Sequence, residues 1–154
     1  MRYWELPPKS KYYEALGALA DERMEETESG ARCYSSSRGK YYDITYDAEA
    51  NTIMANDNGS YWQGYLGYPA VAYLLLVGVL PYRPELAALL KGVAWKDINQ
   101  RYRNDFDAAL AEVLAPLHEE DRDALTEYVK ELATAIEERS LGYEGARAKP
   151  PAGY

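Results

Sequence analysis

The segment from Tyr68 to Leu80 reads YPAVAYLLLVGVL and contains no charged residue. Pro69 suits the first turn of a helix, because its fixed φ angle is helical and its missing amide hydrogen would have no partner there. A helix that is apolar on every side needs a buried position in a globular protein. The segment is too short to span a bilayer, which takes about 20 residues. We therefore expect a central helix over Pro69–Leu80, ended by Pro81.

Four further helices are indicated around this segment by the helical spacing of apolar residues and by suitable end signals. They are expected over residues 10–29, 84–91, 96–116 and 119–139. The first carries acids on its predicted outer face, including Glu14, which we expect to be solvated. Gly17 lies inside the same helix and costs about 1 kcal/mol relative to alanine. That cost indicates a close contact with another helix.

Residues 31–57 change to a strand pattern. Tyr42, Ile44 and Tyr46 alternate with polar residues, which is the period of a half-buried strand, and Asn51 suits a turn. These residues predict a small antiparallel hairpin or meander inserted after the first helix. The whole prediction is a mainly α (α+β) domain over residues 1–141, with about five helices packed around a central apolar helix. Residues 142–154 lack periodicity, and we expect a disordered tail.

The charge balance restricts the partners that the protein can have. The chain has 154 residues with 25 acids and 17 bases, which gives a net charge of −8. A protein that bound nucleic acid over its whole surface would be basic, so such binding needs a local basic patch or a basic partner. The first residues lack the apolar stretch of a secretory signal, and we expect a cytoplasmic protein with no membrane contact. The abundance of Glu and Arg is typical of heat-adapted proteins.

No complete catalytic or metal-binding constellation is present. Cys33 is the single cysteine, and it can form neither an internal disulfide nor a four-cysteine metal site. His118 is the single histidine, and it stands where the last helix would begin. The loop that ends in Gly39-Lys40 has Tyr34 where a phosphate-binding loop needs glycine. We expect no enzyme, no metal and no cofactor, and a small hydrolase is the least favoured interpretation.

A first candidate surface is a basic patch, which we define as the residues Lys91, Lys96, Arg101 and Arg103, with Tyr102 beside them. Arg and Lys side chains bind phosphates, and an exposed ring stacks on a nucleobase. On one continuous helix, Lys96 and Arg103 are seven positions apart and nearly eclipsed, so we expect this pair to act together. A solvated helix face with its rings in the core gives the same pattern.

A second candidate surface is the aromatic segment Tyr61–Tyr68. Its rings are suited to a ligand or a protein partner, and its glycines allow close backbone approach. A tight connector whose rings seal the end of the helices is the alternative. The four residues concerned are Tyr61, Trp62, Tyr65 and Tyr68.

The order of features from Tyr68 to Phe106 resembles a known family. An apolar helix, a short helix, a Trp-Lys-Asp turn and the pair Arg101-Tyr102 follow one another, as in the C-terminal domain of the primase large subunit of archaea and eukaryotes. That domain normally holds a four-cysteine iron–sulfur cluster. With one cysteine, this chain is similar to the cluster-free archaeal accessory subunits of the PriX type. The resemblance covers about a quarter of the chain.

The resemblance implies a noncatalytic accessory subunit of a nucleic-acid-processing complex, active in primer initiation. Such a subunit would work with other protein subunits and would bind a nucleotide, or single-stranded or primed DNA. Only Arg101 and Tyr102 correspond to the family motif. The alternative is a protein-interaction or structural module of another archaeal complex, with no nucleic-acid contact of its own.

Overall fold

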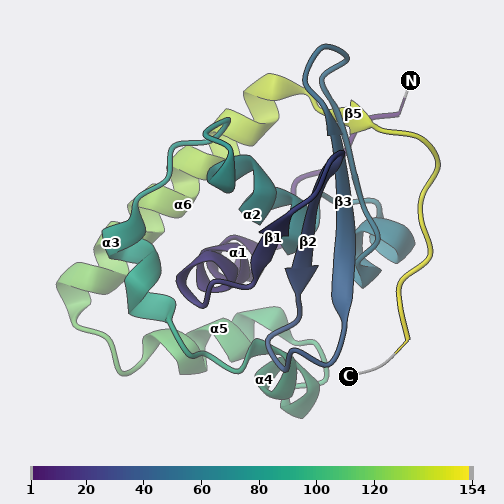
Figure 1. Cartoon of the computed structure of the whole chain (residues 1–154). Coiled ribbons are helices and arrows are strands. Elements are labelled where there is room, and N and C mark those ends of the chain that lie inside the picture. The colour runs from purple at the N-terminus through teal and green to yellow at the C-terminus, as the bar shows by residue number, and fades with distance from the viewer. Residues whose placement is uncertain (1, 153–154) are drawn as a thin grey trace.

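A five-stranded sheet and a layer of helices make up the fold of the computed structural model, which describes residues 2–152 (Figure 1). The helices are α1 (Ser10–Ala20), α2 (Tyr68–Leu76), α3 (Pro84–Ala87), α4 (Trp95–Arg101), α5 (Phe106–Leu114) and α6 (Glu119–Arg139). A π-helix, η1 (Gly59–Gln63), precedes α2, and a 3-10 turn, η2 (Ala88–Leu90), follows α3. The strands are β1 (Met24–Glu26), β2 (Gly30–Tyr34), β3 (Tyr41–Asp47), β4 (Thr52–Ala55) and β5 (Gly142–Tyr143).

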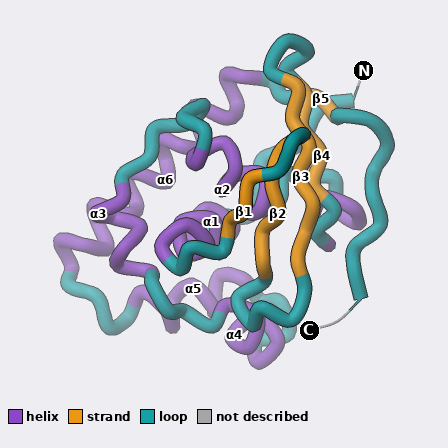
Figure 2. The backbone as a smooth tube through the Cα atoms, viewed as in Figure 1, coloured by secondary structure: helices purple, strands orange, loops and turns teal. Residues whose placement is uncertain are grey.

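The sheet has the order β1-β2-β3-β4-β5 (Figure 2). Neighbouring strands are antiparallel from β1 to β4, and β5 lies parallel to β4. The alternation predicted around Tyr42 and Ile44 is confirmed, since both side chains are buried under the helices. Cys33 lies opposite Tyr42 in the register of β2 and β3. This register places the inner face of the two strands beside α1 and α2.

The prediction of a mainly helical domain with about five helices is wrong, because the meander extends into a full sheet. β1 and β5 come from segments predicted as helix and as disordered tail. Gly142 and Tyr143 cover the hydrogen-bonding edge of β4, which would otherwise be open. After β5 the chain continues beside the sheet, where Asn56 Nδ2 donates to the carbonyl of Lys149. The tail therefore has defined contacts as far as Lys149.

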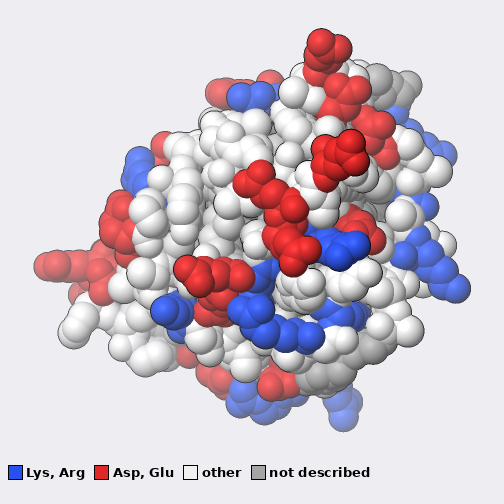
Figure 3. Space-filling view, viewed as in Figure 1, with Lys and Arg blue, Asp and Glu red and all other residues white. Residues whose placement is uncertain are grey.

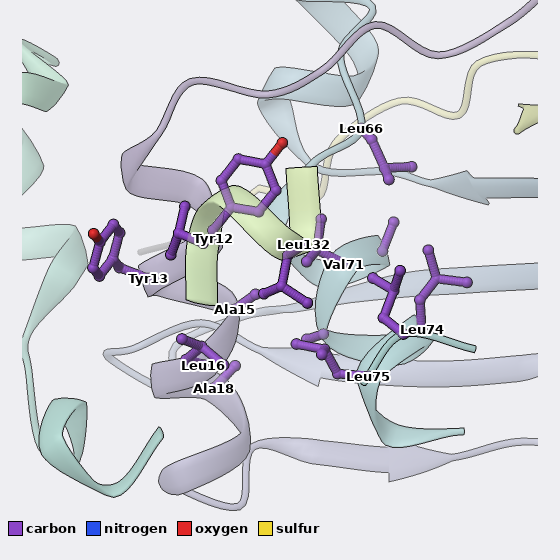
Figure 4. Close-up of a cluster of buried hydrophobic side chains, with 14 of the residues drawn as sticks. Tyr12, Tyr13, Ala15, Leu16, Ala18, Leu66, Val71, Leu74, Leu75 and Leu132 are labelled. Carbon is purple, nitrogen blue, oxygen red and sulfur yellow. The ribbon is translucent and has the colours of Figure 1, made fainter. Parts of the chain in front are cut away.

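The central helix is α1 and not the apolar segment. Every residue from Ser10 to Ala18 is buried, and α1 packs against α2, α3, α5 and α6. Figure 4 shows side chains of α1 among those of α2 and α6. By contrast, Leu76 at the end of α2 is 38% exposed, which contradicts all-round burial of Pro69–Leu80. Gly17 does permit a close contact, as predicted, because Trp95 packs against it.

Two predicted helices are shorter than the sequence pattern indicated. The first ends at Ala20, because Glu22 adopts a left-handed conformation with φ of 54° and the chain turns into β1. The helix predicted over 96–116 is interrupted after Arg101, since Arg103 and Asn104 have φ angles of 52° and 63°. The last helix matches its predicted range of 119–139. Among residues 2–152, no helix is long and apolar enough to cross a membrane.

Candidate functional site

A polar cavity of about 270 Å³ lies between α1, α4, the loop from β2 to β3 and the loop that precedes α2. It is at the small end of the range for ligand sites, and it suits a compact molecule. Buried charges line it, which is unusual because a charge is costly to bury unless it is paired. Its charged lining residues are Lys11, Glu14, Arg23, Asp57 and Lys96.

An ion pair on α1 forms the first part of the cavity wall. Lys11 Nζ lies 2.9 Å from Glu14 Oε2 and 4.0 Å from the ring centre of Phe106. Asn99 Nδ2, on α4, donates to Glu14 Oε1 over 3.3 Å. The prediction of a solvated Glu14 is therefore wrong: α4 and α5 cover this side of α1. The i,i+3 spacing of Lys11 and Glu14 was the available sequence signal, but it does not distinguish a buried pair from a surface pair.

Asp57 also lines the cavity, and its side chain is buried. Its carboxylate accepts hydrogen bonds from the backbone amide of Ser60 over 3.2 Å and from Ser60 Oγ over 2.6 Å. A side chain at Gly67 would overlap this carboxylate, so glycine is needed there. Burial raises the pKa of Asp57, and the hydrogen bonds from Ser60 act in the opposite direction. These contacts hold the loop before α2 in place beside the cavity.

Tyrosines form the wall between the two carboxyl groups. Tyr42, Tyr65 and Tyr68 line the cavity, and Tyr42 meets Tyr68 edge-to-face with ring centres 6.1 Å apart. Burial raises the pKa of each of these phenols, so they stay protonated near neutral pH. Burial also raises the pKa of the Cys33 thiol to about 12, which makes that thiol a poor nucleophile. The wall supplies flat rings and neutral hydroxyl groups.

The mouth of the cavity is basic. The backbone amide of Lys96 donates to Ser36 Oγ over 2.9 Å, which joins α4 to the loop between β2 and β3. Burial lowers the pKa of Lys96, and the neighbouring ammonium of Lys40 lowers it further. Arg23 also lines the cavity, where Nη1 donates to the carbonyl of Tyr34 over 2.8 Å. Figure 3 shows Lys and Arg side chains gathered on one face of the molecule, beside Asp and Glu side chains.

Of the predicted basic patch, only Lys96 lines the cavity. Both guanidinium nitrogens Nη1 and Nη2 of Arg101 donate to Glu112, over 3.0 and 2.8 Å, and the Tyr102 hydroxyl donates to the same carboxylate over 2.9 Å. Arg103 is exposed in the turn after α4, so the expected alignment of Lys96 with Arg103 on one helix is wrong. Lys91 is exposed in the turn after η2.

The aromatic segment divides between two environments. Tyr65 and Tyr68 line the cavity, whereas Trp62 is 66% exposed and meets Tyr61 edge-to-face. The four rings therefore do not form one surface patch. Among residues 2–152, no group of three or more His, Cys, Asp or Glu side chains is arranged to hold a metal ion.

Sequence comparison places the chain in a family. The profile described as "Uncharacterised conserved protein UCP014422" matches residues 4–142. The chain belongs to this family. The region that matches the UCP014422 profile includes every charged residue that lines the cavity. No curated protein and no solved structure matches the chain.

Proposed function

We propose that the protein is a noncatalytic binding module that holds a small phosphate-bearing ligand of the nucleotide class in the polar cavity. The observation that carries this proposal is the ammonium group of Lys96, which lines the polar cavity and has the ammonium group of Lys40 as a neighbour. Two neighbouring cations repel each other, and a bound anion relieves that repulsion. Phosphate oxygens are good acceptors for such groups and for the Ser36 hydroxyl.

The size and walls of the cavity also support a nucleotide-like ligand. About 270 Å³ accommodates a compact molecule, and the rings of Tyr42 and Tyr65 are suitable contacts for a flat base. The resemblance of residues 68–106 to primase accessory subunits makes a nucleotide the first ligand to test. The same resemblance supports a place in a cytoplasmic complex with other protein subunits.

Calorimetric titration with nucleoside mono- and triphosphates tests this proposal. We expect saturable binding to the wild type, which weakens as salt increases. Free ligand at 100 times its Kd should stabilise the fold by about 2.7 kcal/mol. The double variant Lys40→Ala, Lys96→Ala should lose this binding while its circular dichroism spectrum stays native.

Lys130→Ala combined with Lys149→Ala is the matched control, because it removes the same charge from exposed positions outside the cavity. This control should bind like the wild type. Equal binding by the cavity variant, or no binding of any phosphate compound to the wild type, would overturn the proposal.

Nucleic acid is a second candidate ligand, supported by the exposure of Lys91 and Arg103 outside the cavity. Each phosphate contact adds about 0.7 to the slope of log affinity against log salt for a single strand. If these residues bind a DNA backbone, Lys91→Ala with Arg103→Ala should weaken binding of single-stranded DNA and reduce that slope. The same variant should leave nucleotide binding unchanged.

A further inference from the structure

One of the residues that line the cavity has a buried hydrogen-bond acceptor that the protein leaves unused. Asn99 is 8% exposed and lines the cavity from α4. Its Oδ1 atom is buried, and no group within residues 2–152 donates a hydrogen bond to it. A buried polar atom without a partner is costly, so most such atoms in native proteins have one. A donor group on a molecule bound in the cavity can satisfy this acceptor if it reaches Oδ1.

The orientation of this amide is fixed by its neighbour. Asn99 Nδ2 donates to Glu14 Oε1 over 3.3 Å. A flipped amide would place its oxygen against the carboxylate, and two acceptors would then face each other. Glu14 is already engaged, because Lys11 Nζ lies 2.9 Å from its other oxygen. Among Lys11, Glu14 and Asn99, the side-chain acceptor that stays unpaired is therefore Oδ1 of Asn99.

Asn99 and Lys96 lie on the same side of α4. Lys96 and Asn99 are three positions apart, and residues with this spacing are neighbours on a helix surface. Both residues line the cavity. A single small molecule in the cavity can thus contact both Lys96 and the side chain of Asn99.

We propose that Asn99 Oδ1 selects the ligand by accepting a hydrogen bond from an N–H group of its base. This inference rests on the proposed function, and it narrows the ligand to a phosphorylated compound whose heterocycle carries an amino or ring N–H donor. Asn99 then distinguishes such nucleotides from sugar phosphates, which share the phosphate and lack the base. Lys96 and Lys40 bind the phosphate and contribute equally to both classes.

The test compares AMP, CMP, GMP and UMP with ribose 5-phosphate by calorimetric titration. We expect at least one nucleotide to bind the wild type about tenfold or more tightly than ribose 5-phosphate. Asn99→Ala should reduce the affinity for that nucleotide to the level of ribose 5-phosphate, and it should leave the affinity for ribose 5-phosphate unchanged. Gln63→Ala, which removes an exposed amide outside the cavity, is the matched control and should bind like the wild type.

The outcomes separate this inference from the proposed function. If ribose 5-phosphate binds as tightly as every nucleotide, or if Asn99→Ala weakens both classes equally, recognition by Asn99 is overturned and phosphate binding stands. If none of the five probes binds, both proposals are overturned. Should Asn99→Ala fail to fold, as judged by circular dichroism, the comparison of probes on the wild type still decides whether the base is recognised.

Discussion

At the scale of single residues, Gly30, the first residue of β2, has the least space for a side chain among the glycines described. A methyl group at this position would overlap the backbone carbonyl of Ile44 on β3 and would lie 3.1 Å from the Cα of Thr45. Backbone atoms in a paired strand cannot move aside as a flexible side chain can. We predict that Gly30→Ala lowers the free energy of unfolding by about 3 kcal/mol, at the upper end for overpacking. Urea denaturation measures this loss.

Gly78 is the comparison for Gly30, because its backbone conformation restricts substitution there and the space around it does not. Its φ angle is 82°, and a methyl group there would meet nothing within 4 Å. Gly78→Ala should cost about 1 kcal/mol, and Gly78→Asn should cost less, since asparagine tolerates the left-handed region better. Gly30→Asn should be no better than Gly30→Ala. A tolerated Gly30→Ala would show that β2 and β3 can separate at this point.

At the scale of elements, Tyr128 connects α6 to the segment between α2 and α3. Its ring is fully buried, and its hydroxyl donates to the carbonyl of Pro81 over 2.7 Å and accepts from the amide of Arg83 over 3.0 Å. Tyr128→Phe leaves both backbone groups without this partner. We predict a loss of about 1–3 kcal/mol in the free energy of unfolding, measured by chemical denaturation.

Tyr3→Phe is the control for the loss of a hydroxyl group, because Tyr3 is 59% exposed. A substitution at such a position should change stability by less than about 0.5 kcal/mol. If the two variants were equally stable, the hydroxyl of Tyr128 would not be holding α6 to this segment.

At the scale of the whole molecule, Asp57 should make stability depend on pH. Burial raises its pKa in the folded state above the usual 3.8, so the fold binds this proton more tightly than the unfolded chain does. The contribution is therefore most favourable in acid, and it is lost as pH rises from about 4 through the folded pKa. Asp57→Asn removes the ionisable group. We predict that the stability of this variant relative to the wild type increases over that pH window.

Chemical denaturation at several pH values measures this difference, and only its change with pH is informative, since the variant also alters the bonds with Ser60. Asp123→Asn makes the same substitution at an exposed position and serves as the control. A difference between Asp57→Asn and the wild type that stays constant across the range would contradict the prediction.

Several elements of the fold were determined by the sequence itself. The range of α6, the inward side of β3 and the close contact at Gly17 were all predicted correctly. Each depends on local information: an amphipathic stripe with end signals, a period of two, or a glycine within a helical pattern. Composition and spacing also argue against a four-cysteine site and a phosphate-binding loop, and these two absences stay predictions.

The tertiary structure alone decided which helix is central and where the cavity lies. Lys11 and Glu14 form a polar pattern typical of an exposed helix face, yet α4 and α5 cover them because the pair neutralises its own charge. The cavity joins these residues to Asp57 and Asn99, which lie more than 40 positions away along the chain. Periodicity reports which side chains share a face of one element. What packs against that face depends on contacts between distant segments, and no local pattern contains that information.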